Sequence, residues 1–192
     1  MRNLPEILIM RHGETIWNRA GLFQGRLDSP LTDTGCAQAR ALNAILKGLN
    51  FSGEFRAWSS PQGRAHQTAG LAFAGCFDEW TTDDRLSEID IGEATGMMAE
   101  DVFAAFPELD NYPGRIGWQF HVPGGESYDQ ICARAQSWLC ELQEPAVVVS
   151  HGIFIRVLRG VLLGLKADQL DRLEGGQGVV HRIREGKHDI LG

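Results

Sequence analysis

The sequence has no long apolar stretch and no excess of basic residues. The longest apolar stretch, residues 157–165, is interrupted by Arg159 and is too short to cross a bilayer. The apolar run at residues 7–10 is too short for the core of a signal peptide. The formal net charge of −7 argues against a nucleic-acid or anionic-membrane surface, which would need a basic stripe. We therefore expect a cytoplasmic protein without nucleic-acid or membrane partners.

Cysteines and linker segments are also scarce. The cysteines form no CxxC pair and have no accompanying pair of histidines, which argues against a zinc site and favours reduced thiols. They are Cys36, Cys76, Cys132 and Cys140. The chain has no low-complexity tract, internal repeat or Pro/Gly/Ser linker. With 192 residues, 43% of them hydrophobic, it fits a single domain over residues 1–192 with a sizeable core.

Two short, continuous apolar runs, residues 7–10 and 146–150, give the strongest strand signals. Such runs are typical of central parallel strands that are covered on both faces. Helical patterns lie between them, and residues 179–183 and 188–191 indicate a closing hairpin. This alternation predicts an α/β layered domain on a mostly parallel sheet, in which ligands bind beyond the carboxyl ends of the strands.

Four of the expected helices have recognisable ends. Thr32 is a candidate N-cap of the first. Residues 60–61, Ser-Pro, suggest an N-cap followed by proline at the first helical position of the second. Ser127 and Gln130 form a capping box for the third. The fourth is expected over residues 153–163, where a glycine follows.

Each of the two strongest strands runs directly into a histidine followed by glycine, His12 in the first and His151 in the second. If the strands are parallel neighbours, both imidazoles reach the same sheet edge, and the glycines let the backbone turn and approach a ligand. Neutral imidazole is a competent nucleophile towards phosphorus. Guanidinium groups match phosphate oxygens, and Arg11 and Arg64 are the candidates. Glu88 is the carboxyl group expected to protonate the leaving oxygen.

Six sequence blocks resemble, in the same order, the motifs of the histidine phosphatase superfamily, which includes phosphoglycerate mutases and many phosphatases. The first block, residues 11–18, reads RHGETIWN and resembles the family signature. The others are residues 23–32, 59–69, 85–92, 123–127 and 150–152. One RHG tripeptide is a weak signal, but six ordered blocks over nearly the whole chain are a strong one. The resemblance implies a three-layer α/β sandwich with a mostly parallel central sheet, of the phosphoglycerate mutase-like type.

The resemblance also implies a role for each matching residue. His12 is expected to be the nucleophile that becomes phosphohistidine, and Glu88 the proton donor that later acts as base for water. Arg11, Arg64 and His151 are expected to bind the phosphoryl group. Further substrate contacts are expected from Asn18, Gln24, Gly25 and the backbone amide of Gly152. The family uses no metal and no organic cofactor for hydrolysis.

Departures from the family pattern concern the rim of the pocket. Residues 62–63, Gln-Gly, stand where relatives usually carry an apolar residue, which is expected to loosen that turn. Residues 92–96 lack the aromatic residue often found between the two glycines. A small lid segment over about residues 93–123 is rich in large apolar side chains, whose expected role is packing. The alternative is that one of its ring-bearing residues faces the substrate: Trp118, Phe120 or His121.

A purely structural role is the alternative for each candidate. The charged candidates could form a buried network that only supports the fold, but six ordered motifs favour catalysis. Asn18 could be a turn or cap residue, and Glu14 is expected to be an orienting or structural carboxylate. The remaining histidines are expected to be solvated or packing residues; these are His66, His121, His181 and His188.

The sequence therefore predicts a phosphomonoesterase that acts on a small phosphorylated metabolite through a phosphohistidine. The nearest alternative is a phosphoglycerate mutase-type phosphoryl transfer at the same site. A mutase must keep water out, and this compact chain lacks the insertions of the glycolytic mutases, which favours hydrolysis. A phosphate-recognition protein that does not use its site ranks third. A homodimer stays open.

Overall fold

A six-stranded sheet forms the centre of the protein in its computed structural model, which describes residues 4–49, 55–112 and 114–192. The strand order is β3-β2-β4-β1-β5-β6. The strands are β1 (Ile7–Arg11), β2 (Arg56–Ser59), β3 (Thr81–Thr82), β4 (Ala146–Ser150), β5 (Val180–Arg184) and β6 (Lys187–Leu191). The first four of these run parallel to one another, β5 is antiparallel to β1, and β6 is antiparallel to β5. The predicted mostly parallel sheet is confirmed.

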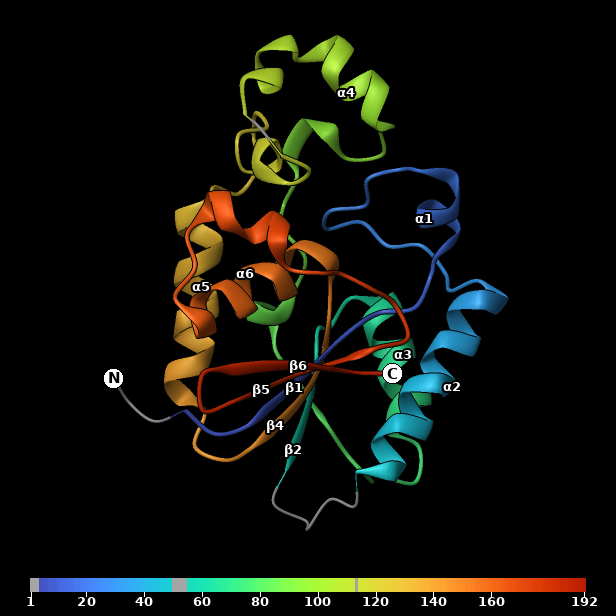
Figure 1. The fold of residues 1–192 in the computed structure, drawn as a ribbon. Coiled ribbons are helices and arrows are strands. Elements are labelled where there is room, and N and C mark those ends of the chain that lie inside the picture. Colours follow the sequence, from blue (N-terminus) through green and yellow to red (C-terminus); the bar gives the residue numbers. More distant parts are fainter. Residues whose placement is uncertain (1–3, 50–54, 113) are drawn as a thin grey trace.

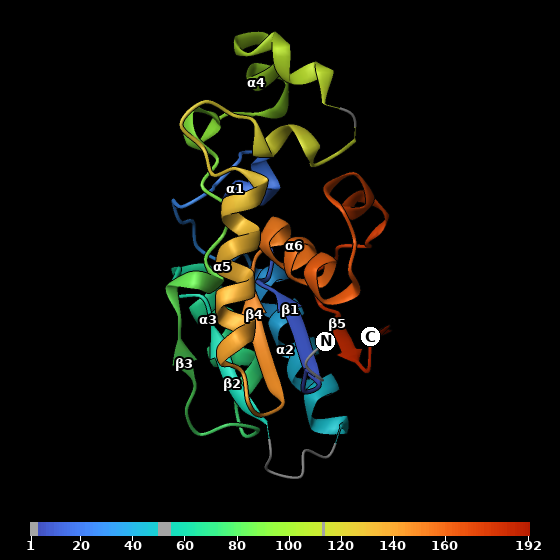
Figure 2. The same cartoon turned by 90° about the vertical axis from the view of Figure 1, so that its left-hand side faces the viewer.

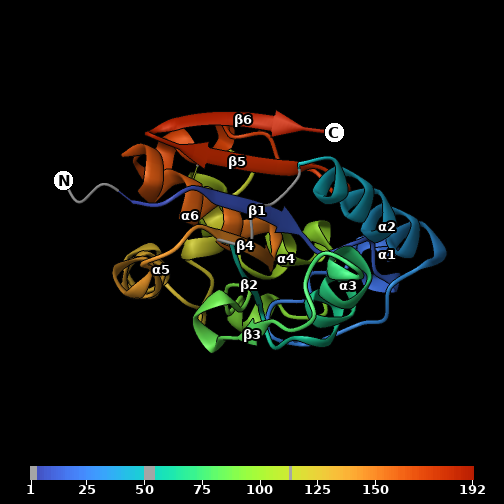
Figure 3. The ribbon, with the colours of Figure 1, turned by 90° about the horizontal axis from the view of Figure 1, so that it is seen from below.

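Helices cover both faces of this sheet (Figure 3). The α-helices are α1 (Ile16–Ala20), α2 (Asp33–Gly48), α3 (Gly63–Phe73), α4 (Ala99–Ala105), α5 (Tyr128–Glu141) and α6 (Gly152–Leu163). Leu8 and Met10 of β1 pack with α2 and α3, whereas Ile7 and Ile9 pack with α5 and α6. Because successive side chains of a strand point to opposite faces, β1 must be apolar throughout. The predicted three-layer sandwich is confirmed.

Three helix ends have the capping residues that the sequence predicts. The Thr32 hydroxyl accepts the Gly35 amide at 3.0 Å at the start of α2. Ser127 and Gln130 form the expected reciprocal capping box on α5. Gly164 ends α6 in the left-handed conformation, with φ of 68°. These ends fix where α5 and α6 lie relative to β4, which they flank in the sequence.

The start of α3 differs from the prediction. This helix begins at Gly63 with Gln62 as its N-cap, rather than at Pro61 behind a Ser60 cap. The Ser60 hydroxyl accepts the Gln62 amide at 3.2 Å and lies 2.8 Å from Nε2 of His151. Ser60 is therefore used to hold a histidine of the neighbouring strand end, and the helix starts two residues later.

The closing hairpin is present, with three of its four strand ends one residue away from those expected. Its two-residue turn consists of Glu185 and Gly186, with φ of 52° and 72°. Two consecutive positive φ values match the twist of a β-hairpin, and glycine accepts such a conformation without strain. The hairpin pairs with β1 through β5 and so covers the edge of the parallel part of the sheet.

The segment made up of residues 93–112 and 114–122 lies beyond the carboxyl edge of the sheet (Figures 1 and 2). It contains α4 and the 3-10 helices Pro107–Asn111 and Gly117–Phe120. It packs on its own apolar cluster, in which Trp118 meets Phe23 edge-on at 5.1 Å between ring centroids. We call this segment the upper segment. None of the helices that the structure describes is long and apolar enough to span a bilayer.

Candidate active site

The carboxyl ends of β1 and β4 bring His12 and His151 together. The His12 amide donates to the Ser150 carbonyl at 2.9 Å, which extends the pairing of the two strands. The centroids of the two imidazole rings are 5.1 Å apart, and both side chains are buried. The two strand–His–Gly motifs therefore meet at one sheet edge, as their sequence context predicts.

Each of these histidines is followed by a glycine, and the two glycines make room for different neighbours. A Cβ atom on Gly13 would lie 2.3 Å from the carbonyl oxygen of Gly35, so the chain just after β1 can pass this close to α2 only without a side chain there. A Cβ atom on Gly152 would lie 3.3 Å from the guanidinium carbon of Arg11. Gly13 thus makes room for a helix rather than for a ligand, which corrects the expectation, whereas Gly152 leaves room around Arg11.

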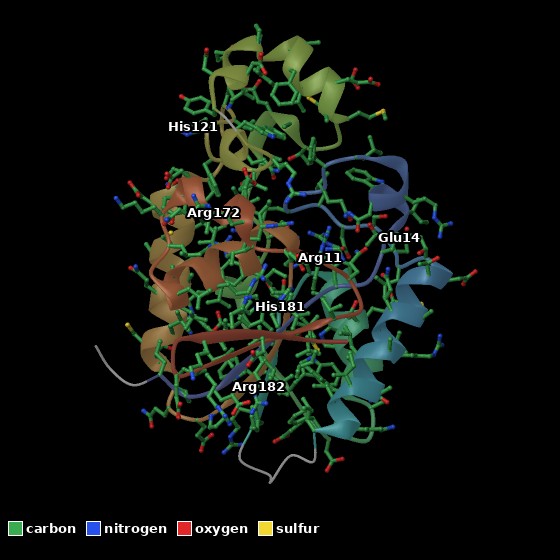
Figure 4. The ribbon with its side chains drawn as sticks, viewed as in Figure 1. Arg11, Glu14, His121, Arg172, His181 and Arg182 are labelled. Atoms are coloured by element: carbon green, nitrogen blue, oxygen red, sulfur yellow. The ribbon has the colours of Figure 1, made fainter. Side chains whose placement is uncertain are left out.

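A cavity of about 280 Å³ opens at this sheet edge, and Arg11 lies between the sheet and the upper segment (Figure 4). Eight of the nine predicted site residues line it: Arg11, His12, Asn18, Gln24, Gly25, Arg64, Glu88 and Gly152. The ninth, His151, is fully buried against His12. Three buried polar atoms of these residues have no hydrogen-bond partner: Arg11 Nε, Gln24 Oε1 and His151 Nδ1. Unpaired buried polar atoms are costly, so a polar ligand would relieve them.

His12 is held as a neutral imidazole. Its Nδ1 lies 2.8 Å from the Gly13 carbonyl, which only an N–H can satisfy, so Nε2 is unprotonated and carries the lone pair. Nε of Arg64 donates to that Nε2 at 3.3 Å. Burial, followed by the charges of Arg11 and Arg64, lowers the pKa of His12 well below its usual value. A nucleophilic ring nitrogen is therefore available at neutral pH.

Arg64 is buried and anchored on every side. Its Nη1 donates to the Leu27 carbonyl at 2.6 Å and to Asp28 Oδ1 at 3.0 Å, and its Nη2 donates to the Gly25 carbonyl at 2.9 Å. Asp28 also accepts the Arg64 amide at 3.2 Å, at the start of α3. A Cβ atom on Gly63 would lie 2.2 Å from the Asp28 carboxylate, so this glycine permits the contact. The sequence motifs gave no sign of Asp28.

The side chain of Gln62, the N-cap of α3, hydrogen-bonds to two other loops of the site. Its Nε2 donates to the Gly25 carbonyl at 3.0 Å, and its Oε1 accepts the Glu88 amide at 2.7 Å. The prediction that residues 62–63 loosen this turn is therefore wrong, because the polar side chain adds two hydrogen bonds that an apolar residue could not make. Gln62 therefore links the loop at Gly25 to the loop that carries Glu88, and both loops line the cavity.

The Glu88 carboxylate lies at the amino end of α6. Its Oε1 accepts the amides of Ile89 and Phe154, each at 3.0 Å, and its Oε2 accepts the Ile153 amide at 3.2 Å. These three amides fix the direction of the carboxyl group. Glu88 therefore lines the cavity in a fixed position, across from the loop of Gln24 and Gly25 that Gln62 ties to it.

Asn18 is both a cap residue and a cavity residue. Its Oδ1 accepts the Thr15 amide at 3.3 Å within the capping box of α1. Gln177, which no motif marked, donates from Nε2 to the same Oδ1 at 3.4 Å and to the His12 carbonyl at 3.1 Å. Because Oδ1 is occupied, Asn18 can offer its Nδ2 hydrogens to a ligand.

Other predicted residues lie away from the cavity. Glu14 is structural, as expected, because its Oε1 accepts Thr32 Oγ1 at 2.6 Å and Arg19 Nη2 at 2.8 Å at the start of α2 (Figure 4). His121 stacks on Tyr112 with the ring centroids 3.5 Å apart. The packing role expected for the upper segment holds for Trp118 and Phe120, which are buried, and none of its three ring-bearing candidates lines the cavity. Two neighbours do so instead: Ile116 and Gln119.

The part of the chain that the structure describes contains no group of three or more His, Cys, Asp or Glu side chains arranged to hold a metal ion.

Two of the four histidines outside the site pair with each other. His181 Nδ1 lies 3.2 Å from His188 Nε2, and His181 is fully buried, so a packing role fits it.

Comparison with known proteins agrees with this geometry. The model of the histidine phosphatase superfamily (branch 1) matches residues 7–190. A 2,3-bisphosphoglycerate-dependent phosphoglycerate mutase of Beijerinckia indica is 31% identical over 190 residues, which cover 93% of this chain and 91% of that protein. A probable phosphoglycerate mutase of Photorhabdus laumondii is 32% identical over 178 residues, 88% of this chain and 79% of that protein.

Solved structures with the same fold carry other names. The mycobacterial glucosyl-3-phosphoglycerate phosphatase, in a complex with VO3, has a TM-score of 0.79 and 25% identity over 93% of this chain and 90% of that one. An Escherichia coli protein described as an α-ribazole-5′-phosphate phosphatase has a TM-score of 0.80 over 98% of this chain and 95% of that one; at 23% identity it shows the fold alone. On the match over residues 7–190, this chain belongs to the histidine phosphatase superfamily.

Proposed function

We propose that this protein is a phosphomonoester hydrolase that acts on a small phosphorylated metabolite through a phosphohistidine at His12. The observation that carries the proposal is the state of that imidazole: buried, neutral and held by the Gly13 carbonyl so that Nε2 stays unprotonated. Arg11 and Arg64 lie beside it, and Glu88 lines the same cavity. Phosphoryl transfer needs this combination of positioned nucleophile, positive charge and acid.

In the first step, Nε2 of His12 forms a bond to phosphorus while the bond from phosphorus to the ester oxygen breaks. Arg11, Arg64 and His151 would bind the equatorial oxygens, with help from Asn18 and the Gly152 amide. The departing oxygen takes the proton of the Glu88 carboxyl group and leaves as an alcohol. The charge that develops on the phosphoryl oxygens is met by groups that are already in place.

In the second step, the Glu88 carboxylate removes a proton from a water molecule, whose oxygen bonds to phosphorus. The nitrogen–phosphorus bond breaks at the same time, so inorganic phosphate leaves and His12 returns to its neutral form. Glu88 regains the proton that it gave in the first step. Neither step uses a metal ion or an organic cofactor, so activity should persist in the presence of EDTA.

Phosphoglycerate mutase activity is the second candidate, because the chain is 31% identical to a phosphoglycerate mutase over 190 residues. Both activities begin with attack by His12, so detection of phosphohistidine does not separate them. They differ in the fate of the phosphoryl group, which a hydrolase passes to water and a mutase returns to the retained alcohol. The compact chain favours transfer to water.

The test is incubation with 3-phosphoglycerate, with and without 2,3-bisphosphoglycerate as primer. We expect inorganic phosphate to appear faster than 2-phosphoglycerate in both cases. The primer is needed because a mutase that has lost its phosphoryl group is inactive without it. Rapid exchange of the two isomers with little phosphate release would replace the hydrolase with a mutase, and absence of both reactions with a broad panel of phosphomonoesters would favour a phosphate-recognition protein.

A further inference from the structure

Arg156 of α6 lines the cavity without a role in the proposed chemistry. Its Nη1 donates to the Gly152 carbonyl at 3.2 Å and its Nε to the Leu173 carbonyl at 3.4 Å. The side chain is half-buried, and burial, followed by the charge of Arg115, lowers its pKa. Two long bonds to neutral carbonyls leave much of the guanidinium group without a partner.

The other arginines near the cavity show why this is unusual. Arg64 pairs with Asp28 at 3.0 Å, and Arg134 pairs with Glu126 at 2.6 Å. Among the residues that the structure describes, no carboxylate lies within 4.0 Å of the guanidinium nitrogens of Arg11 or Arg156. Glu88 acts on both guanidinium groups at longer range, and Asp171 acts on Arg156, but neither arginine has a contacting counter-ion. A half-buried cation of this kind is costly, and an anion from outside the protein would relieve the cost.

Both unpaired guanidinium groups contact the same glycine. Gly152 leaves 3.3 Å between its absent Cβ and the guanidinium carbon of Arg11, and its carbonyl accepts the Nη1 hydrogen of Arg156. The two cations are therefore neighbours, one next to the nucleophile and the other one helical turn along α6. Six apolar residues also line the cavity: Leu22, Phe23, Ile89, Ile91, Ile116 and Ile153.

The positions of these two cations indicate separate roles. Arg64 already pairs with Asp28, so Arg11 and Arg156 are the lining arginines without a contacting carboxylate. Arg11 lies next to the nucleophile and is placed for the phosphoryl group. Arg156, one helical turn along α6, is placed for a further anionic group on the same molecule, because a guanidinium group matches such a group in charge and geometry.

We propose that Arg156 binds a second anionic group of the substrate, a carboxylate or a second phosphate, a few bonds from the phosphoryl group. This inference rests on the proposed function for the placement of the first phosphoryl group. Arg156 then determines specificity, because it favours anionic phosphomonoesters over neutral ones of the same size without touching phosphorus.

A substitution at Gly175 is a second, independent way to displace the same guanidinium group. A Cβ atom at this position would lie 2.3 Å from Nη2 of Arg156. Gly175 is exposed and its φ is not positive, so alanine fits its backbone, and the flexible arginine must move instead. Gly175→Ala therefore displaces the proposed anion-binding group without removing its charge.

The test compares matched pairs of competitive inhibitors of p-nitrophenyl phosphate hydrolysis. One pair is 3-phosphoglycerate and glycerol 3-phosphate, which differ by a carboxylate; the other is fructose 1,6-bisphosphate and fructose 6-phosphate, which differ by a phosphate. We expect the wild type to bind the more anionic member of at least one pair about tenfold more tightly. The pair with the larger ratio identifies the preferred group.

In Arg156→Gln this ratio should fall to about threefold or less, with an intermediate value in Arg156→Lys and a reduced one in Gly175→Ala. Arg172→Gln is the matched control, because Arg172 is exposed, does not line the cavity and should keep the wild-type ratio. Equal affinities within both pairs in the wild type, or equal losses for both members in Arg156→Gln, would overturn the proposal.

Two outcomes keep this test separate from that of the proposed function. If the wild type does not hydrolyse p-nitrophenyl phosphate, the hydrolase proposal fails, and the same pairs are compared by calorimetric binding to the wild type. A preference there, lost in Arg156→Gln, still supports the anion-binding role. If Arg156→Gln does not fold, Arg156→Lys and Gly175→Ala decide the question through the same ratio.

Discussion

The helix α6 passes two clusters of arginine and histidine. The cavity cluster consists of Arg11, His12, Arg64 and His151, and the buried cluster consists of Arg159, His181 and His188. Burial lowers the imidazole pKa in both, to about 3 for His181, and neighbouring arginines add to the effect. Judged by residue type and titration alone, the two clusters are alike.

Their access to a cavity differs, although in each cluster an arginine N–H donates to the unprotonated nitrogen of an imidazole. In the buried cluster, Nη1 of Arg159 donates to Nδ1 of His181 at 3.1 Å, so the His181 proton must lie on Nε2, which has no partner. None of the three residues of this cluster lines the cavity. In the cavity cluster, Nε of Arg64 donates to Nε2 of His12 at a longer 3.3 Å, and His12 lines a cavity that Glu88 also lines. A lowered pKa marks a reactive site only where a cavity and an acid accompany it.

The largest expected effect separates the two clusters by activity. His12→Ala removes the nucleophile and should lower kcat for p-nitrophenyl phosphate by at least about 10⁴-fold, without unfolding the protein. His181→Asn keeps an acceptor for Arg159 and should leave kcat within about twofold of the wild type. Phosphate release and the thermal midpoint are measured for both variants. Comparable losses of kcat in the two would mean that the buried cluster is functionally coupled to the cavity.

The next largest effect concerns the proton donor Glu88, which has no counterpart in the buried cluster. Glu88→Gln cannot donate a proton and should slow hydrolysis by about 10² to 10⁴-fold for an alkyl phosphate. The loss should be smaller for an aryl phosphate, because its departing oxygen is weakly basic and needs less protonation. The measurement is kcat/KM over a series of leaving groups. A slope against leaving-group pKa that is the same in the wild type and the variant would give Glu88 another role.

The third effect concerns stability against pH. The folded pKa of His181, about 3, lies below the unfolded value of about 6.5, so the unfolded chain binds the proton more strongly. This contribution is fully present above about pH 6.5 and is lost as the pH falls towards 3, by up to roughly 3 to 5 kcal/mol. His12 and His151 act in the same direction, so the variant is compared with the wild type. His181→Asn should lose less stability between pH 7 and pH 4 in urea titrations; parallel losses would mean that His181 does not titrate.

Local patterns in the sequence were sufficient to predict which residues lie at the sheet edge, but not to predict the side-chain contacts around them. Two apolar runs ending in His-Gly place His12 and His151, because both strands are covered on both faces and lie side by side. Ser60 is not the helix cap that its sequence context predicts, because its hydroxyl hydrogen-bonds to His151, 91 residues away in the sequence. A cap motif describes what a side chain can do locally, and a tertiary partner can override it.

The supporting residues of the site share the same difficulty. Asp28 is 36 residues from Arg64, Gln62 is 26 residues from Glu88, and Gln177 is 165 residues from His12. Each is an ordinary polar residue in a loop or at a helix end, so neither periodicity nor a cap pattern marks it. Only the folded chain shows that they hold the residues that face the ligand. Such residues are predicted from contacts rather than from motifs.

The smallest expected effect tests one of these supports. Gln177 donates to the oxygen of Asn18, so Gln177→Leu should let the Asn18 amide rotate and lower kcat/KM about three- to tenfold, the worth of one hydrogen bond. Asn18→Ala should cost more, and in the double variant the Gln177 change should add almost nothing, since its only proposed role is to orient Asn18. Gln143→Leu, on an exposed residue, controls for the loss of a surface amide. Additive losses in the double variant would instead assign the effect of Gln177 to its bond with the His12 carbonyl. A general loosening of the fold is excluded if Gln177→Leu keeps both the stability and the pH profile of the wild type.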